Sequence, residues 1–315
     1  MVISRRGVVA VLTANVLFGV IYLYGSFMQP MLGTDVFAWR MVSMLVALTA
    51  LMFMLKAWPE AKAFIVRMNE KPVQWLLFLL STAVVAVNFW IFMWGPVNGY
   101  GIDVALGYFL LPLTTILMAL MVFGEKLNTW QKWAITFAAM GVGHELWVAQ
   151  SLSWVAMLCC LSYPFYYGIR RHLAVPALVG LWLDLVLIAP VAMVYLLVYS
   201  DSFTLLAAQW KFIPLIVSLG IISALAMFGL LYAMRALPIT LFSMLTYGEP
   251  ILLFVLAILF MGAPLTIDAM MTYGMIWLGL SLMMWDSYLQ MRKSTGTETL
   301  KTDEEDDDSV VVGSN

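Results

Sequence analysis

The feature that most constrains this sequence is a succession of apolar segments, each about 20 residues long, separated by short polar breaks. A helix of about 20 residues spans the roughly 30 Å hydrocarbon core of a membrane. Ten such segments can be identified: 7–26, 35–55, 73–94, 101–123, 131–150, 152–170, 177–199, 212–235, 239–262 and 269–290. Only 11% of the residues are charged, whereas soluble domains carry about 25%. The sequence therefore predicts an all-α polytopic membrane protein with ten transmembrane helices.

The basic residues between these segments fall on one side of the predicted bundle. Basic residues precede the first segment and occupy every second connection after it, whereas the opposite connections hold only Lys211. They are Arg5, Arg6, Lys56, Lys62, Arg67, Lys71, Lys126, Lys132, Arg170, Arg171, Arg235, Arg292 and Lys293. Since lysine and arginine are enriched in cytoplasmic loops, we expect both termini to be cytoplasmic.

Two polar regions stand outside this pattern. The longest connection, 56–72, is basic and amphipathic, which predicts a segment that lies on the inner membrane face. Residues 294–315 hold seven of the 18 acidic residues and one base, Lys301. Because this tail contains few apolar residues, it is predicted to be disordered.

An internal similarity suggests that the membrane region consists of two related halves. Pro112 and the Gly-x-x-Leu ending that follows it recur 138 positions later, where the proline is Pro250. The halves would be residues 1–150 and 151–293, with five helices each. Because five is an odd number, the second half would be inverted in the membrane. Inverted repeats that meet near the bilayer midplane are the architecture of many secondary transporters.

Three motifs carry a resemblance to a known family: Asn88-Phe89-Trp90, the run VALGYFLLPL at 104–113, and Gly124-Glu125-Lys126. Together they resemble RarD-type permeases, in the EamA branch of the drug/metabolite transporter superfamily. The resemblance covers residues 7–293. It implies ten helices in two inverted five-helix repeats, a bacterial inner-membrane location and export of small molecules. The chain departs from the RarD pattern at Glu249, and at 262–264, where many relatives repeat a Gly-Glu pair.

The ionisable residues inside the apolar segments are the candidate site. Such a group costs at least about 2.5 kcal/mol in the hydrocarbon, so it is retained mainly where it is paired or lines a polar cavity. Arg40, Asp184 and Glu249 lie within predicted helices, and Asn88 adds a neutral polar group. Arg40 would anchor an anionic or carbonyl group, while Asp184 or Glu249 would bind a cation or a coupling proton. The alternative is that Arg40 reaches the membrane interface or forms a static pair with a carboxylate.

Aromatic residues at inner depth would form the walls of the site, since their faces can stack on a planar substrate or hold a cation. Ordinary packing is the alternative for each of them. The predicted substrate-binding residues are Arg40, Asn88, Trp94, Tyr108, Asp184, Tyr247 and Glu249, with Glu249 and Asp184 as candidates for proton coupling.

Motifs of other protein classes do not occur in the sequence. It contains no Walker A loop and no His-Glu-x-x-His, Cys-x-x-Cys or Gly-x-Ser-x-Gly motif, and Cys159 and Cys160 are adjacent in an apolar run. We therefore expect a non-enzymatic secondary-active transporter that exports a small organic metabolite or drug by alternating access. It would have no cofactor, metal or nucleic-acid partner, would contact a small-molecule substrate and membrane lipid, and would act as a monomer or homodimer.

Two alternatives to a transporter remain open. The intramembrane charges would also suit an integral-membrane enzyme that acts on lipid, or they would be buried pairs in a non-transporting scaffold. One connected cavity lined by Arg40, Asn88 and Glu249 would favour the transporter, whereas separate locations would weaken it.

Overall fold

The computed structural model describes residues 4–149, 153–249, 252, 267, 270–272, 274–286 and 288–289. All regular secondary structure in this part of the chain is helical, which confirms the predicted all-α class. The helices are α1 (Arg5–Phe27), α2 (Gly33–Met54), α3 (Trp58–Asn69), α4 (Pro72–Val97), α5 (Gly101–Phe123), α6 (Thr129–Ala149), α7 (Trp154–His172), α8 (Ala177–Val198), α9 (Ser202–Ala208), α10 (Phe212–Ala236) and α11 (Ile239–Thr246). Stretches of α2, α4, α5, α8 and α10 are long and apolar enough to cross a membrane. The protein is a polytopic helical membrane protein.

Most helix boundaries lie within a few residues of the predicted segments. Two helices are additional: α3 occupies the predicted amphipathic connection, and α9 lies between the seventh and eighth segments. The segment predicted at 239–262 begins as α11, but its second half is largely outside the described residues. The predicted last segment is helical at each described residue between 270 and 289, and the acidic tail lies outside the described part.

Local sequence explains where several of these helices begin and end. The side chains of Ser4 and Ser153 accept hydrogen bonds from backbone N–H groups in the first turns of α1 and α7. Pro72 occupies the first turn of α4, where its missing N–H is not needed. Gly124 ends α5 with a left-handed φ of 61°, a conformation that glycine adopts without steric cost.

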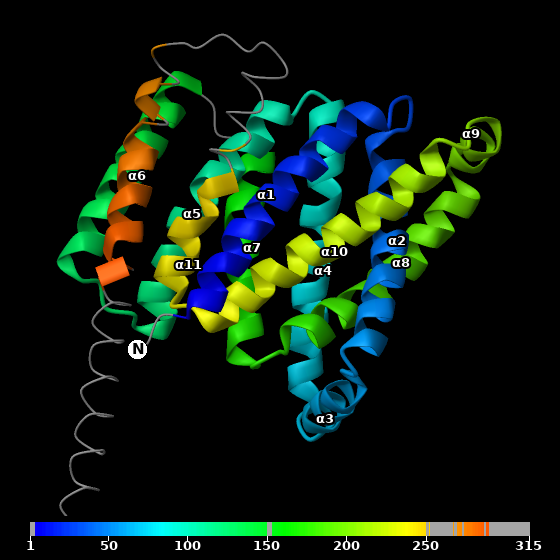
Figure 1. Ribbon diagram of the computed structural model, residues 1–315, viewed down its shortest axis with the longest axis horizontal. Helices are drawn as coiled ribbons and strands as arrows, with labels where there is room; N and C mark the ends of the chain where they lie inside the picture. Colours follow the sequence, from blue (N-terminus) through cyan, green and yellow to red (C-terminus); the bar gives the residue numbers. More distant parts are fainter. Residues whose placement is uncertain are drawn as a thin grey trace, which may run out of the picture.

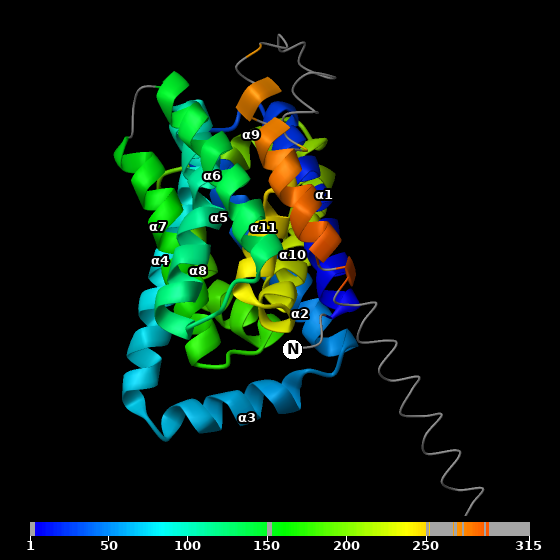
Figure 2. The same ribbon diagram turned by 90° about the vertical axis from the view of Figure 1, so that its left-hand side faces the viewer.

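The long helices form one bundle with a short helix at each end (Figure 1). Within the bundle, α1 packs along α10, α5 packs along α7, and α2 packs against both α8 and α10. Figure 2 shows α3 lying across one end of the bundle and α9 at the opposite end. We call these the α3 end and the α9 end. The helices α6 and the C-terminal helical segment stand side by side at the edge of the bundle (Figures 1 and 2).

The amphipathic connection is a helix that packs on the bundle. Phe64 and Met68 of α3 are buried, and the Arg67 guanidinium donates a hydrogen bond of 2.7 Å to the carbonyl of Leu173, just after α7. The apolar face of α3 therefore covers the end of the bundle. Contact with a membrane surface stays a prediction.

The close approach of α2 and α10 depends on a residue without a side chain. A Cβ atom added at Gly220 of α10 would lie 2.5 Å from the Oγ of Ser43 and 2.6 Å from its carbonyl carbon on α2. Real Cβ atoms essentially never approach other atoms so closely, so a larger residue would push the two helices apart.

We expect Gly220→Ala to destabilise the protein by about 1–3 kcal/mol, the usual cost of overpacking a close-packed interface. The matched control is Gly143→Ala in α6, where an added Cβ meets no described atom within 4 Å. The control should be neutral, or stabilised by up to about 1 kcal/mol because alanine favours helix over glycine. Unfolding of both variants in detergent micelles measures the difference, and equal stability would contradict the tight α2–α10 contact.

Candidate functional site

A small cavity lies at the centre of the bundle. Its volume is about 30 Å³, which is space for about one water molecule. Its walls combine a basic side chain, Arg40, and an acidic side chain, Glu249, with a largely aromatic surface. The lining residues are Phe18, Arg40, Phe89, Phe92, Tyr108, Leu111, Tyr163, Tyr167, Leu230, Thr246 and Glu249.

Arg40 provides the positive charge of this central cavity. Its side chain is buried, its Nε donates a hydrogen bond of 2.9 Å to Ser223 of α10, and its guanidinium carbon lies 5.6 Å and 5.7 Å from the ring centroids of Phe89 and Phe92. Cation–π contact at that distance is favourable, and more so away from water. Within the described part of the chain, the two terminal nitrogens of Arg40 make no hydrogen bond. They are available to an anionic or carbonyl group in the cavity.

Glu249 provides the acidic side chain. It lies just beyond α11 and lines the same cavity as Arg40. Among the described residues, no ion pair within 4.0 Å joins Glu249 to Arg40. The cavity is therefore lined by a basic and an acidic side chain that are not paired with each other within 4.0 Å.

Five of the six aromatic residues that line the cavity, Phe18 of α1 and two pairs on α4 and α7, were not among the site residues predicted from the sequence. Phe89 and Phe92 are three positions apart on α4, and Tyr163 and Tyr167 are four apart on α7. Each pair therefore lies on one face of its helix. This spacing is visible in the sequence, but it does not tell which face of a fully apolar helix points to the centre. Tyr108, which was predicted, does line the cavity and packs against Tyr163 at 6.1 Å between ring centroids.

Three predicted residues are neighbours of lining residues in the sequence but do not line the cavity themselves. Asn88 is buried and donates to Ser162 of α7, so it joins α4 to α7. Trp94 stacks on Trp90 at 4.8 Å between centroids, towards the α9 end of α4. Tyr247 is fully buried, and its hydroxyl has no hydrogen-bond partner among the described residues.

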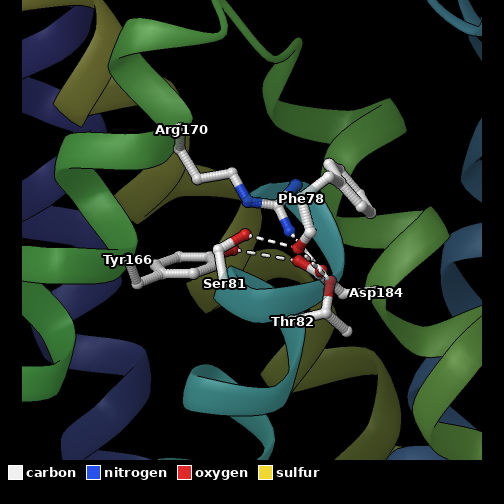
Figure 3. Close-up of polar contacts among 6 residues, drawn as sticks. All are labelled: Phe78, Ser81, Thr82, Tyr166, Arg170 and Asp184. Atoms are coloured by element: carbon white, nitrogen blue, oxygen red, sulfur yellow. Dashed lines mark hydrogen bonds and ion pairs between the residues drawn. The ribbon is translucent and has the colours of Figure 1, made fainter. Parts of the chain in front are cut away.

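Asp184 lies in a separate polar cluster, which Figure 3 shows in close-up. Its carboxylate forms an ion pair with Arg170 of α7 and accepts hydrogen bonds from Thr82 of α4, at 2.5 Å, and from Tyr166 of α7, at 3.0 Å. The expectation that Asp184 and Arg40 approach one cavity is therefore not met in this structure. The cluster joins α4, α7 and α8 instead.

The position of Arg170 differs from the sequence expectation, which placed it in a connection between helices. It lies in the last turn of α7, is buried, and its guanidinium carbon is 3.9 Å from the ring centroid of Phe78. A Cβ at Gly180 would lie 2.9 Å from its Nη1, so Gly180 leaves the space that this side chain fills. The sequence did not indicate the ion pair between Arg170 and Asp184, because two adjacent arginines at a helix end suggest a solvated cytoplasmic loop.

Glu125 connects the two predicted halves at the α3 end. Its carboxylate accepts hydrogen bonds from the backbone N–H groups of Ile239 and Thr240, at 2.8 Å and 3.0 Å, and from the Thr240 hydroxyl at 2.8 Å. Arg171 lies 3.5 Å from the same carboxylate. Glu125, the middle residue of the Gly-Glu-Lys motif, therefore caps the first turn of α11, where an anion is favoured by the helix dipole.

The described residues contain no group of three or more side chains that could hold a metal ion.

Comparisons with known proteins agree with a membrane transporter. The chain is 37% identical to an uncharacterized transporter of Haemophilus influenzae, over 93% of this chain and 98% of the relative. It is 36% identical to the chloramphenicol-sensitive protein RarD of Pseudomonas aeruginosa, over 92% and 97% of the two chains, and 26% identical to protein RarD of Escherichia coli. No protein-family model matches the chain.

A solved crystal structure shares the fold. It has 15% sequence identity and a TM-score of 0.64, and the match covers 88% of this chain and 95% of that chain. The fold and the relatives define the class of the protein as a multi-pass membrane transporter. Given the identity and coverage of its relatives, the chain belongs to the RarD family of permeases.

We expect Asp184→Ala to destabilise the protein by about 3–5 kcal/mol, because it leaves the buried Arg170 charge unpaired. The double variant Arg170→Met, Asp184→Leu should recover most of this loss, since apolar residues of similar volume often replace a buried pair without cost. Asp201→Ala, which removes an exposed carboxylate, is the control. Unfolding in detergent micelles measures all four proteins, and a double variant as unstable as the single one would contradict the role of the pair.

Proposed function

We propose that the protein is a secondary-active carrier that moves a small organic molecule across the bacterial inner membrane by alternating access. The observation that carries this proposal is the central cavity, which Arg40 and Glu249 line together with aromatic side chains. Arg40 belongs to the first predicted half and Glu249 to the second. A space for about one water molecule is too small for a metabolite, so the surrounding helices would have to separate before a substrate could bind.

The packing of the helices supports two inverted halves, 1–150 and 151–293. In such a repeat α1 corresponds to α7, α2 to α8, α4 to α10, and α5 to α11. The packing of α1 on α10 then has its counterpart in that of α7 on α4, and the packing of α5 on α7 in that of α11 on α1. Inverted halves that meet around a central site favour a carrier.

The α2–α10 interface and its equivalent between α8 and α4 differ in extent, which would fit a carrier in one of its two states. The α2–α10 interface is extensive and includes the close contact at Gly220, whereas its counterpart, between α8 and α4, is in contact over only a short stretch. Exchange of these two arrangements would open the central cavity to one side and then to the other.

The charges suggest how a substrate would be held. We assign Arg40 to a carboxylate or carbonyl group of the substrate, Glu249 to a cation or a coupling proton, and Tyr108 to a stacking contact. Asn88, Trp94 and Tyr247 would support these walls from behind. Asp184 stays a candidate for proton coupling, although its pairing with Arg170 favours a structural role.

Orientation follows from the basic residues, most of which flank the α3 end; we place that end in the cytoplasm. The resemblance to RarD permeases implies outward transport by a monomer or homodimer. The names of the relatives fit a transporter, and we propose no catalytic activity, cofactor or nucleic-acid partner for the chain. Because one relative is named for chloramphenicol sensitivity, chloramphenicol is the first probe to test.

The test is counterflow of radiolabelled chloramphenicol into proteoliposomes, together with metabolites selected by a thermal-shift screen. We expect Arg40→Gln to reduce counterflow by more than about tenfold, since loss of a buried charged partner costs about 2–5 kcal/mol. Arg235→Gln, which removes an exposed charge on α10, should leave counterflow unchanged. If the wild-type protein moves none of these compounds faster than empty liposomes do, the carrier assignment is wrong.

Proton coupling requires a separate measurement, because an uncoupled carrier would also support counterflow. We expect an imposed pH gradient to drive accumulation of the same substrate by the wild-type protein. Glu249→Gln should abolish this accumulation while counterflow persists, since the amide cannot release a proton. Glu60→Gln on the exposed face of α3 is the control. Accumulation that survives both Glu249→Gln and Asp184→Asn would exclude coupling through these carboxylates.

A further inference from the structure

A second, larger cavity lies away from the central one. It is a groove of about 510 Å³ between α4 and α8, with the first part of α2 also lining it. It shares no lining residue with the central cavity. Small side chains create the space, namely Ala38, Ala83, Ala86 and Ala192, whereas exposed apolar side chains such as Val87 and Val191 line its rim.

The groove presents no charge and no unpaired polar side chain. Trp90 donates to Thr34 at 3.3 Å, Tyr195 donates to Asp35 at 3.1 Å, and Thr82 donates to Asp184 at 2.5 Å. These are the polar residues among its lining side chains, and each already has a partner. A polar ligand or water would find few groups to bind in this groove. The groove therefore suits an uncharged, apolar chain.

The length of the groove indicates which apolar chain would fit it. Its lining on α4 runs from Leu79 to Trp90, which at about 1.5 Å per residue is about 17 Å. The hydrocarbon core is about 30 Å thick, so one leaflet is about half of that. Trp90 and Tyr195 lie towards the α9 end, and such amphipathic rings are enriched where the hydrocarbon meets the head groups.

We propose that the groove binds one acyl chain of a membrane phospholipid from the leaflet at the α9 end. The chain would lie along α4, with its methyl end near Leu79 and its head group beyond Trp90. Because it would occupy the space between α4 and α8, it would favour the state in which these helices are apart. That consequence rests on the proposed alternating access, whereas the binding itself does not.

The test uses nanodiscs that contain phosphatidylethanolamine with a diazirine group in one acyl chain. After irradiation and digestion, mass spectrometry should locate cross-links on 79–90 of α4 and 187–195 of α8, above the level on the exposed face of α6. Ala86→Phe fills the groove and should reduce these cross-links to the level of α6. Leu80→Phe enlarges an exposed residue of α4 outside the groove and should leave them unchanged.

A second variant keeps the test decisive if Ala86→Phe does not fold: Ala192→Phe fills the same groove from α8 and should have the same effect. Gel filtration and circular dichroism check the fold of each variant. Cross-links spread evenly over all exposed helices, or unchanged in both filled variants, would overturn the proposal. Since cross-linking needs no transported substrate, its result is independent of the counterflow experiment.

Discussion

The cost of burying charge in an apolar bundle is the constraint that organises this protein. The long helices consist mostly of apolar residues, which need no polar partner. The ionisable side chains of Arg40, Arg170, Asp184 and Glu249 do need one. A charge in such surroundings persists only with a partner, or in a cavity that a polar group can share. The structure uses both solutions. Arg170 and Asp184 neutralise each other between α7 and α8, while Arg40 and Glu249 face a common cavity without a direct pair.

The two solutions have different consequences. A paired charge with additional hydrogen bonds from Thr82 and Tyr166 fixes the relative positions of three helices, which suits a rigid element. An incompletely satisfied charge attracts a ligand, which suits a binding site. Contacts at the two ends of the bundle complement this arrangement. Glu125 joins α5 to the start of α11 at the α3 end, and Trp39 of α2 donates to Ser202 of α9 at the opposite end. Polar contacts therefore join helices at both ends of the bundle.

The length of the apolar segments was sufficient to predict most of the long helices, because the thickness of the membrane sets that length. The same reasoning singled out Arg40, Glu249 and Tyr108, which line one cavity in the structure, since an ionisable residue or a tyrosine within an apolar segment stands out. The sequence did not indicate that Asp184 belongs to a different polar cluster. Its partner Arg170 lies at the end of α7, and only the rotation of that helix shows that the Arg170 side chain is buried. Phe89, Phe92, Tyr163 and Tyr167 were missed for a related reason. On a helix that is apolar on every face, periodicity does not show which face meets the centre.

The central claim is that one cavity, lined by Arg40 and Glu249, opens alternately to the two sides of the membrane. Its most direct test is a single cysteine at Phe92 in a background with Cys159→Ala and Cys160→Ala. Membrane-impermeant thiol reagents are applied to right-side-out vesicles and to inside-out vesicles. The account predicts that Phe92→Cys is labelled from each side, and that a transported substrate slows both reactions. Labelling from one side only, whatever the substrate or gradient, would contradict it.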